Sequence, residues 1–206
     1  MTRYRMYPSS TQHSDFLVHC AQARFVWNLA VEQQSFWAPW RGPVPGSAER
    51  FRQLTEARAA SDWLRAGSVM IQQQALRDFD QALRNFFNGT HRRPTWRKKH
   101  LHNGFRIVAT GPDDVRRLNR RWAEVKVPKI GWVRFRWTRP VGEFKSYRVT
   151  LDRRGRWHIA FAQVPEPIPA PGTGEVVGID RGVVHAATLS TGEHQDFDTS
   201  DLERRI

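Results

Sequence analysis

The first ninety residues combine one short alternating segment with long helical periods. Residues 3–7 alternate basic and apolar side chains and are followed by Pro8, which predicts a short strand ended by a turn. Ser9–Thr11 offer N-caps for a stretch without Gly or Pro that runs from residue 11 to residue 36. The helical period of this stretch places on one face Leu17, Cys20, Trp27 and Val31.

Two further helices are predicted before residue 90. One runs from residue 48 to 64, and the next begins after the Ala66–Gly67 break and runs from 68 to 87. The apolar stripe of the latter has spacings of 3, 4 and 3 residues and consists of Leu76, Phe79, Leu83 and Phe86. This part of the chain therefore predicts one strand and a small helical bundle.

Beyond residue 100 the apolar period changes to two. Strands are predicted at 105–109, 122–127, 132–137, 147–151 and 157–164, with a hairpin turn at 152–155. Five short strands without intervening helices predict a small antiparallel barrel or sandwich. Residues 165–174 are rich in Pro and Gly and predict a semi-rigid linker, after which a strand, a tight connection and a hairpin follow.

The basic residues are concentrated in the middle of the chain. The 206 residues carry a formal net charge of +13. Residues 91–156 hold 20 basic and 5 acidic residues, a net charge of +15, whereas residues 1–90 have a net charge of +3 and residues 157–206 of −5. A basic block of this kind predicts a polyanionic partner, and nucleic acid is the first candidate.

Composition also excludes several classes of protein. The single cysteine, Cys20, excludes internal disulfides and a multi-cysteine zinc site within these residues, so no zinc site is expected. No apolar run approaches the ~18 residues of a membrane span, and the first ten residues lack the apolar region of a signal peptide. We therefore expect no membrane partner, and a cytoplasmic protein that joins the nucleoid when it binds DNA.

The densest basic run spans residues 91–100 and contains one tryptophan. Its cationic side chains are candidates for phosphate contacts and its indole for base stacking. The alternative is a flexible, solvated loop. The candidate nucleic-acid-binding residues of this run are Arg92, Arg93, Trp96, Arg97, Lys98 and Lys99.

The strand predicted at residues 132–137 has two unlike faces. Alternation places Val133, Phe135 and Trp137 on one face, and Arg134, Arg136 and Trp132 on the other. Two arginines beside a tryptophan suit a surface that follows a phosphate backbone and stacks a base, so Arg134 and Arg136 are further candidates. The alternative is an ordinary solvated strand face.

Asp180 closes an apolar run and is followed by Arg181 and Gly182. An acid at the end of a buried strand can be held rigidly at a cleft, as in two-metal nucleases that bind Mg²⁺. One carboxylate does not make such a site, and the alternative is a turn aspartate after a core strand. The acids that follow it are expected to be solvated: Glu193, Asp196, Asp198, Asp201 and Glu203.

Eight strings in one order together resemble the TnpB (OrfB) family of insertion-sequence proteins, which are known as transposases and are relatives of the single-effector CRISPR nucleases. Among them are RYRMYPSSTQ, ARFVWNLAVEQ, QQALRDFDQALRNFF, PTWRKKH, VPKIGWVRFR, GRWHIAFAQV and VVGIDRGVVHAATLSTG. Each string alone is weak, but the order makes the resemblance specific, and it covers nearly the whole chain.

The resemblance implies an α+β fold in which a small helical bundle is inserted in a wedge-like antiparallel β-barrel and is followed by the first strands of an RNase H-like (RuvC-type) domain. The implied divisions are a first barrel strand at 1–8, a recognition bundle at 9–90, a basic β-barrel at 91–164, a linker at 165–174 and the start of a truncated nuclease domain at 175–206.

The resemblance also implies partners and roles. Guide RNA and double-stranded target DNA are the expected partners, and Gln73 and Thr110 are candidates for contact with the short motif beside the target. The alternative for Gln73 is a solvated helix residue. Asp180 matches the first catalytic acid, with Mg²⁺ as the cofactor. The sequence ends at Ile206, before the family's later acids and zinc-binding cysteines. We therefore expect neither Mg²⁺ binding nor cleavage by this chain alone, and a second polypeptide would have to supply the rest.

The sequence thus predicts the nucleic-acid-binding N-terminal portion of a TnpB-like transposase and RNA-guided DNA endonuclease. Three alternatives remain open: a nuclease-dead, RNA-guided regulator that binds promoter DNA, a non-functional remnant of a transposase, and a barrel that binds RNA without sequence preference.

Overall fold

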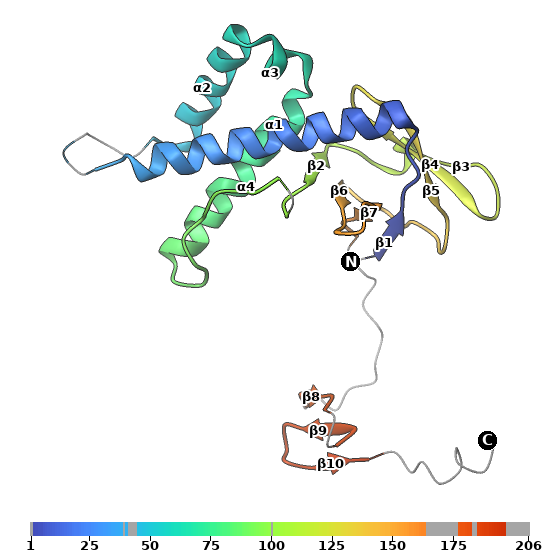
Figure 1. Cartoon of the computed structure of the whole chain (residues 1–206). Coiled ribbons are helices and arrows are strands. Elements are labelled where there is room, and N and C mark those ends of the chain that lie inside the picture. The colour runs from blue at the N-terminus through green and yellow to red at the C-terminus, as the bar shows by residue number, and fades with distance from the viewer. Residues whose placement is uncertain are drawn as a thin grey trace. The chain divides into compact units, whose positions relative to one another are not determined.

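The computed structural model describes residues 2–38, 40, 45–99, 101–163, 177–182 and 185–196. Its contacts divide the chain into two units, Met1–Val164 and Pro165–Ile206. The predicted linker at 165–174 lies outside the described residues. With four α-helices and only antiparallel strand pairs among the described residues, the chain is α+β, as predicted (Figure 1).

The first helix, α1, spans Ser10–Ser35 and begins at a capping box. The Ser9 hydroxyl accepts a hydrogen bond from the Gln12 amide at 3.2 Å, and the Gln12 side chain accepts one from the Ser9 amide at 3.1 Å, which satisfies two backbone donors. α1 packs against α4 and β2 (Figure 1). The buried face of α1 is therefore centred on Phe16, which is fully buried. Leu17 lies 100° further around the helix and is 37% exposed, so it does not belong to the buried face as predicted.

The helix predicted at residues 48–64 is in fact two helices. α2 spans Ser47–Ala60 and α3 spans Asp62–Ala66, because Ser61 is extended, with φ −129° and ψ 111°, and its hydroxyl accepts a hydrogen bond from the Leu64 amide. The next helix, α4, spans Val69–Phe87. Three members of its predicted stripe are buried and the fourth packs against the core: Leu76, Phe79, Leu83 and Phe86.

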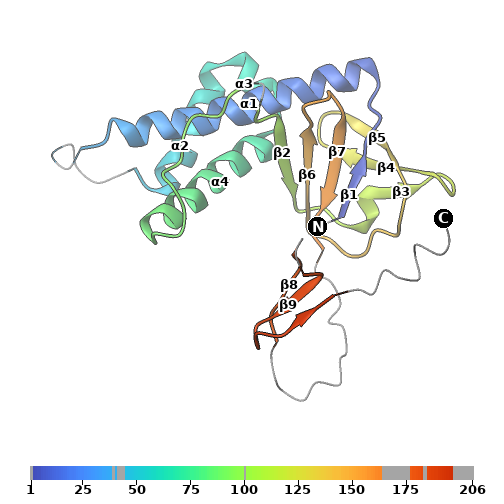
Figure 2. The ribbon, with the colours of Figure 1, turned by 60° about the horizontal axis from the view of Figure 1, so that its bottom comes forward.

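Seven strands of the first unit form two antiparallel sheets (Figure 2). The four-stranded sheet has the order β1-β7-β6-β2 and contains Thr2–Arg5, Trp157–Phe161, Ser146–Leu151 and Gly104–Val108. The three-stranded sheet has the order β3-β4-β5 and contains Val115–Arg117, Trp122–Val127 and Gly131–Arg136. Five strands were expected in the basic block, and β3 was missed because it is only three residues long.

A barrel or a sandwich was predicted here, and the described strands form two antiparallel sheets that join where β1 meets β5 and do not close into a barrel. Met6 pairs with Phe135, and the Tyr7 amide donates to the Arg134 carbonyl at 2.7 Å, which joins β1 to β5. Within the described part of the chain, no ladder joins β2 to β3. Ala109 has a positive φ of 52° and Pro112–Asp114 form a 3-10 turn, which ends β2 and redirects the chain before β3 begins.

The core of the first unit lies between the two sheets and continues under α1. The Tyr4 ring packs edge-on against Phe135 at 5.5 Å and Phe161 at 5.6 Å between ring centroids, and all three are buried. The buried Tyr147 hydroxyl donates to the Lys126 carbonyl at 2.7 Å, which connects β6 to β4. This hydrogen bond and the aromatic cluster hold the open arrangement together without a closing ladder.

The second unit contains three short antiparallel strands in the order β10-β9-β8, made of His194–Gln195, Ala187–Leu189 and Ile179–Asp180. The hairpin predicted after the linker is present as β9 and β10, and Gly192 in its turn has a positive φ of 90°. Ile179 is 66% exposed, so the strand before Asp180 is not buried as predicted, because no described residue covers it. None of the helices described has both the length and the apolar character needed to cross a membrane.

The turn between β6 and β7 gives the fold an acid-sensitive point. The Asp152 carboxylate accepts hydrogen bonds from the Arg156 amide at 2.9 Å, the His158 ring at 3.1 Å and the Arg154 amide at 2.9 Å. These hydrogen bonds hold the pKa of Asp152 well below its usual range, and the hydrogen bond from the Arg156 amide has the largest effect.

Because the pKa of Asp152 is lower in the folded protein than in the unfolded chain, its contribution to stability is complete above pH ~4 and is lost as the pH falls further. We expect Asp152→Asn to flatten the loss of stability measured by urea unfolding between pH 5 and pH 2. Asp113→Asn, at an exposed carboxyl without a hydrogen bond to a described residue, serves as the matched control. Equal pH profiles for the two variants would contradict this prediction.

Candidate nucleic-acid interface

The outer face of the β3-β4-β5 sheet carries arginine and aromatic side chains. In the β4–β5 register, Trp122 lies opposite Arg136, Glu124 opposite Arg134, and Lys126 opposite Trp132. The intervening residues Ala123, Val125, Val133 and Phe135 are buried on the inner face. The predicted division of residues 132–137 into an apolar face and an Arg/Trp face is therefore confirmed.

Trp122 is the centre of this outer face. The guanidinium groups of Arg136 and Arg134 lie 5.2 and 5.8 Å from its ring centroid, and the Tyr7 ring meets it edge-on at 5.0 Å. Cation–π contact within about 6 Å orients a guanidinium without neutralising its charge. Among the described residues, neither arginine has a carboxylate partner. Both therefore keep their charge available for a phosphate.

A second tryptophan extends the same face. The Arg116 guanidinium lies 4.3 Å from the Trp132 ring centroid and forms an ion pair with Glu124 at 2.6 Å. The Arg5 guanidinium lies 5.1 Å from the ring centroid of Tyr7. We name this surface the arginine–aromatic face; it consists of Arg5, Tyr7, Arg116, Trp122, Trp132, Arg134 and Arg136.

The basic run after α4 is attached to α1. The Trp27 indole donates to the Thr95 carbonyl at 2.9 Å, and the Asn28 side chain accepts from the Arg97 amide at 2.7 Å and donates to the Arg97 carbonyl at 3.2 Å. These bonds fix residues 95–97, while Trp96 is 54% exposed. Residue 100 is not described. The other cationic candidates are exposed: Arg92, Arg93, Lys98 and Lys99.

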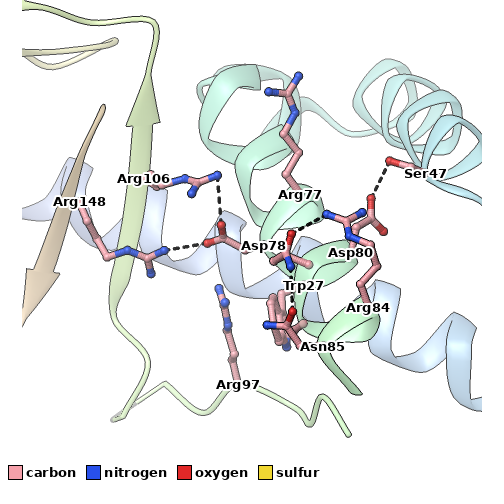
Figure 3. Close-up of a pocket in the computed structure, with 12 residues that line it drawn as sticks. Trp27, Ser47, Arg77, Asp78, Asp80, Arg84, Asn85, Arg97, Arg106 and Arg148 are labelled. Atoms are coloured by element: carbon pink, nitrogen blue, oxygen red, sulfur yellow. Dashed lines mark hydrogen bonds and ion pairs between the residues drawn. The ribbon is translucent and has the colours of Figure 1, made fainter. Parts of the chain in front are cut away.

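Arg97 differs from its neighbours in the run because its side chain turns inward. Its guanidinium lies 3.6 Å from the Trp27 ring centroid, and burial lowers its pKa to about 10. It lines a cavity of about 500 Å³ formed by α1, α4, β2 and β6 (Figure 3). The arginines that line this cavity are Arg77, Arg84, Arg97, Arg106 and Arg148.

Two carboxylates share the cavity with these arginines. Asp78 forms ion pairs with Arg148 at 2.9 Å and Arg106 at 3.3 Å (Figure 3). Asp80 is instead engaged by the buried Arg50 at 3.2 Å and by the Ser47 hydroxyl at 2.6 Å. Among the described residues, only Arg106 and Arg148 of the five arginines form an ion pair with a carboxylate, that of Asp78.

Four of these arginines were not predicted from the sequence. They lie on three elements that are distant in the chain and come together only in the fold. Arg77 and Arg84 are seven residues apart on α4, which places them on one helix face. Arg106 and Arg148 are direct partners in the β2–β6 ladder. The helix spacing was readable in the sequence, but the strand pair becomes visible only once the register is known.

The two motif-reading candidates lie on separate elements. Gln73, half-buried on α4, lines a different cavity of about 250 Å³ together with Arg58 and Arg65, and its amide makes no hydrogen bond to any described residue. Thr110 follows β2, and its hydroxyl donates to the Asp114 carboxylate at 2.7 Å. Gln73 therefore has both amide donors and an acceptor available, whereas Thr110 can only accept.

Asp180 lies exposed at the end of β8, opposite Thr188. The hollow beside it, about 380 Å³, is lined by no second carboxylate among the described residues. The described part of the chain holds no cluster of three or more His, Cys, Asp or Glu residues suited to a metal ion. One carboxylate does not fit the oxygen-rich coordination that Mg²⁺ requires, so these residues alone do not form a magnesium site.

The acids of the tail are only partly described. Asp196 accepts hydrogen bonds from the His185 ring at 3.0 Å and the Ala186 amide at 2.9 Å, which lower its pKa. Asp196 is exposed, in agreement with the predicted solvation, and it also forms hydrogen bonds within the hairpin. Glu193 is exposed, and the remaining acids lie outside the described residues: Asp198, Asp201 and Glu203.

Comparison with known proteins bears on the resemblance noted from the sequence. The chain is 28% identical over 199 residues to a protein of Escherichia coli (strain K12) named "Putative RNA-guided DNA endonuclease InsQ", covering 92% of this chain and 47% of that protein. It is also 28% identical over 202 residues to a "Putative RNA-guided DNA endonuclease" of Streptomyces pristinaespiralis, covering 93% and 48%.

The chain spans about half the length of these curated relatives. No protein-family model matches the chain. The two relatives nevertheless match over more than nine-tenths of this sequence, and their names agree with the family that its ordered strings resemble. The comparisons therefore support the resemblance noted from the sequence: over more than nine-tenths of its length, this chain is similar to proteins named as putative RNA-guided DNA endonucleases.

Proposed function

We propose that residues 1–163 form the nucleic-acid-binding part of a TnpB-like, RNA-guided DNA endonuclease, which binds a guide RNA and the DNA beside its target. The arginine–aromatic face carries this proposal, because Arg134 and Arg136 have no carboxylate partner among the described residues and lie beside the Trp122 ring. Backbone phosphates meet the guanidinium groups while unpaired bases stack on the rings. The exposed cations of the basic run extend the same phosphate-binding function.

Gln73 and Thr110 take the role of contacting the short DNA motif. A glutamine amide can bind adenine through one donated and one accepted hydrogen bond in the major groove, and the amide of Gln73 is free to do so. Thr110 contributes an acceptor only, since its proton is used by Asp114. In this proposal the protein recognises the motif and base pairing with the guide recognises the rest of the target.

Binding of RNA by sequence distinguishes this function from a sequence-tolerant RNA-binding protein. The experiment compares the purified chain's affinity for RNA transcribed from the region flanking its gene with its affinity for scrambled RNA of equal length, between 50 and 300 mM salt. A guide-binding protein prefers the flanking RNA by about tenfold or more at every salt concentration. Equal affinities with a steep salt dependence would support the sequence-tolerant alternative.

A second candidate function follows from Asp180. Residues 175–206 would begin an RNase H-like domain in which Asp180 is the first catalytic acid, and a second polypeptide would supply the remaining metal ligands. Without such a partner the chain would bind its target and not cut it, as a nuclease-dead regulator does. This candidate is supported by the hollow beside β8, where Asp180 is the one carboxylate among the residues that the structure describes.

We expect the 206-residue polypeptide, with flanking RNA and Mg²⁺, to leave a supercoiled plasmid carrying the matching target intact. Within the described part of the chain, Asp180 is the one carboxylate at the hollow beside β8, and one carboxylate cannot position two metal ions for in-line displacement. Plasmid nicking is measured on agarose gels, with Asp180→Ala as the matched variant. Cleavage by the unaltered chain that disappears in the Asp180→Ala variant would refute this prediction.

A further inference from the structure

The cavity between α4 and the four-stranded sheet holds more positive charge than its own carboxylates neutralise. Arg106 and Arg148 are direct cross-strand partners, and like charges placed opposite one another on a sheet repel. The Asp78 carboxylate, 17% exposed, lies between them and pairs with both (Figure 3). Asp78 thus acts as an internal anion for two guanidinium groups.

Three more arginines line the cavity without a carboxylate partner among the described residues. Arg97 stacks on Trp27, Arg84 donates to the Gln81 side chain at 2.7 Å, and Arg77 lies over the Phe51 ring at 5.9 Å. In addition, the Nε atom of Arg106 is buried and has no hydrogen-bond partner among the described residues. The cavity therefore offers unused guanidinium donors around one carboxylate.

We propose that this cavity binds a backbone phosphate of a nucleic-acid strand. Before the phosphate binds, the Asp78 carboxylate pairs with Arg106 and Arg148 and keeps both guanidinium groups in position. The inference rests on the proposed function, since the phosphate belongs to a bound strand. A phosphodiester carries one negative charge on two free oxygens, the same charge and fork that a carboxylate presents to a guanidinium. Exchange of one anion for the other leaves the two strand arginines in position.

Burial supports this assignment. The pKa of Arg97 is lowered mainly by desolvation, while the charge of Asp78 raises it and that of Arg148 lowers it. A cation that is desolvated and lacks its own carboxylate gains from a nearby phosphate. Asp78 then remains close to the phosphate and weakens its binding by charge repulsion. The charge of this one residue therefore limits the affinity of the cavity for the strand.

The test measures binding of a fluorescein-labelled 20-nucleotide oligouridylate to the full chain. Asp78→Asn is expected to bind it on the order of tenfold tighter than the unaltered protein at 0.1 M salt, because one repulsive charge is removed at contact distance. The salt dependence should steepen, since the freed arginines hold buffer anions that the strand must displace.

The matched control is Asp62→Asn, which removes the same charge from an exposed pair with Arg65 on α3. It corrects for the change in net charge. A second variant, Arg148→Gln in the Asp78→Asn background, should abolish the gain if the phosphate binds at Arg148. Thermal unfolding of each variant shows that it is folded.

Equal affinities for Asp78→Asn and Asp62→Asn would overturn the inference while leaving the proposed guide binding untouched, because that function is tested by RNA preference. Weaker binding by Asp78→Asn would also overturn it and would make the carboxylate a structural partner only. A parallel experiment measures binding of inorganic pyrophosphate to the same variants. If Asp78→Asn binds pyrophosphate more tightly but shows no gain for the oligouridylate, the cavity binds a free phosphate and the assignment to a nucleic-acid strand is overturned.

Discussion

Trp122→Ala is expected to weaken binding of single-stranded RNA by about tenfold to a hundredfold. Stacking of one base on an aromatic side chain contributes about 1–3 kcal/mol by alanine substitution. The variant also removes the ring near which Arg134 and Arg136 lie, at 5.8 and 5.2 Å from its centroid, so both guanidinium groups lose their fixed position. Fluorescence anisotropy with a labelled oligonucleotide measures the loss.

Two variants show whether the loss comes from this face. Trp122→Phe keeps a smaller aromatic ring and should recover part of the affinity. Trp40→Ala removes a tryptophan that is 84% exposed and lies outside the arginine–aromatic face, so it should change the affinity less than threefold. If Trp122→Ala and Trp40→Ala lose affinity equally, stacking at this face does not contribute to binding.

Gly67→Ala is expected to lower the free energy of unfolding by about 3 kcal/mol. Gly67 has an ordinary φ of −80°, so strain is not the cause. A Cβ at this position would overlap the amide group of Gln22, which is fully buried. Overpacking costs about 1–3 kcal/mol, and each buried polar group left without a partner costs a similar amount.

The cost is high because the Gln22 amide cannot move aside freely. It donates to the Trp63 carbonyl at 2.6 Å and accepts from the Gln72 side chain at 3.2 Å, and Gln72 in turn donates to the Leu64 carbonyl at 2.8 Å. This network attaches α1 to α3 and α4. Displacing one amide therefore breaks hydrogen bonds on three helices at once.

Urea unfolding measures the effect, with Gly111→Ala as the control. Gly111 has an extended φ of −154° and open space where a Cβ would lie, so its replacement should leave stability within about 0.5 kcal/mol of the unaltered protein. A loss below about 1 kcal/mol in Gly67→Ala would mean that the packing around Gln22 is looser than the structure indicates.

Local signals in the sequence predicted the elements well where one residue decides them. Ser9 caps α1 through a capping box that can be read directly from its spacing to Gln12. The alternation of Trp132–Trp137 predicted the two faces of β5, because a strand has one period and one buried side. These features depend on neighbours in the chain, and the sequence contains all of them.

Features that depend on distant partners were not predictable in the same way. The barrel stays open because β1 changes partner from β7 to β5 at Met6 and no ladder joins β2 to β3 in the described part of the chain, which no local pattern encodes. The arginine cavity requires the pairing of Arg106 with Arg148 and the approach of Asp78 from α4. Only Arg97 of this group was a candidate, and as a surface cation.

The proposed function requires that this chain binds a particular guide RNA, which can be tested by sequencing the RNA that co-purifies with the tagged full chain from its native host. We expect one abundant RNA that is transcribed from beside the gene and ends in a variable guide, and its recovery should fall in the Trp122→Ala variant and stay unchanged in Trp40→Ala. Recovery of bulk cellular RNA without enrichment of any transcript would contradict the claim and would leave a basic surface that binds RNA without selection.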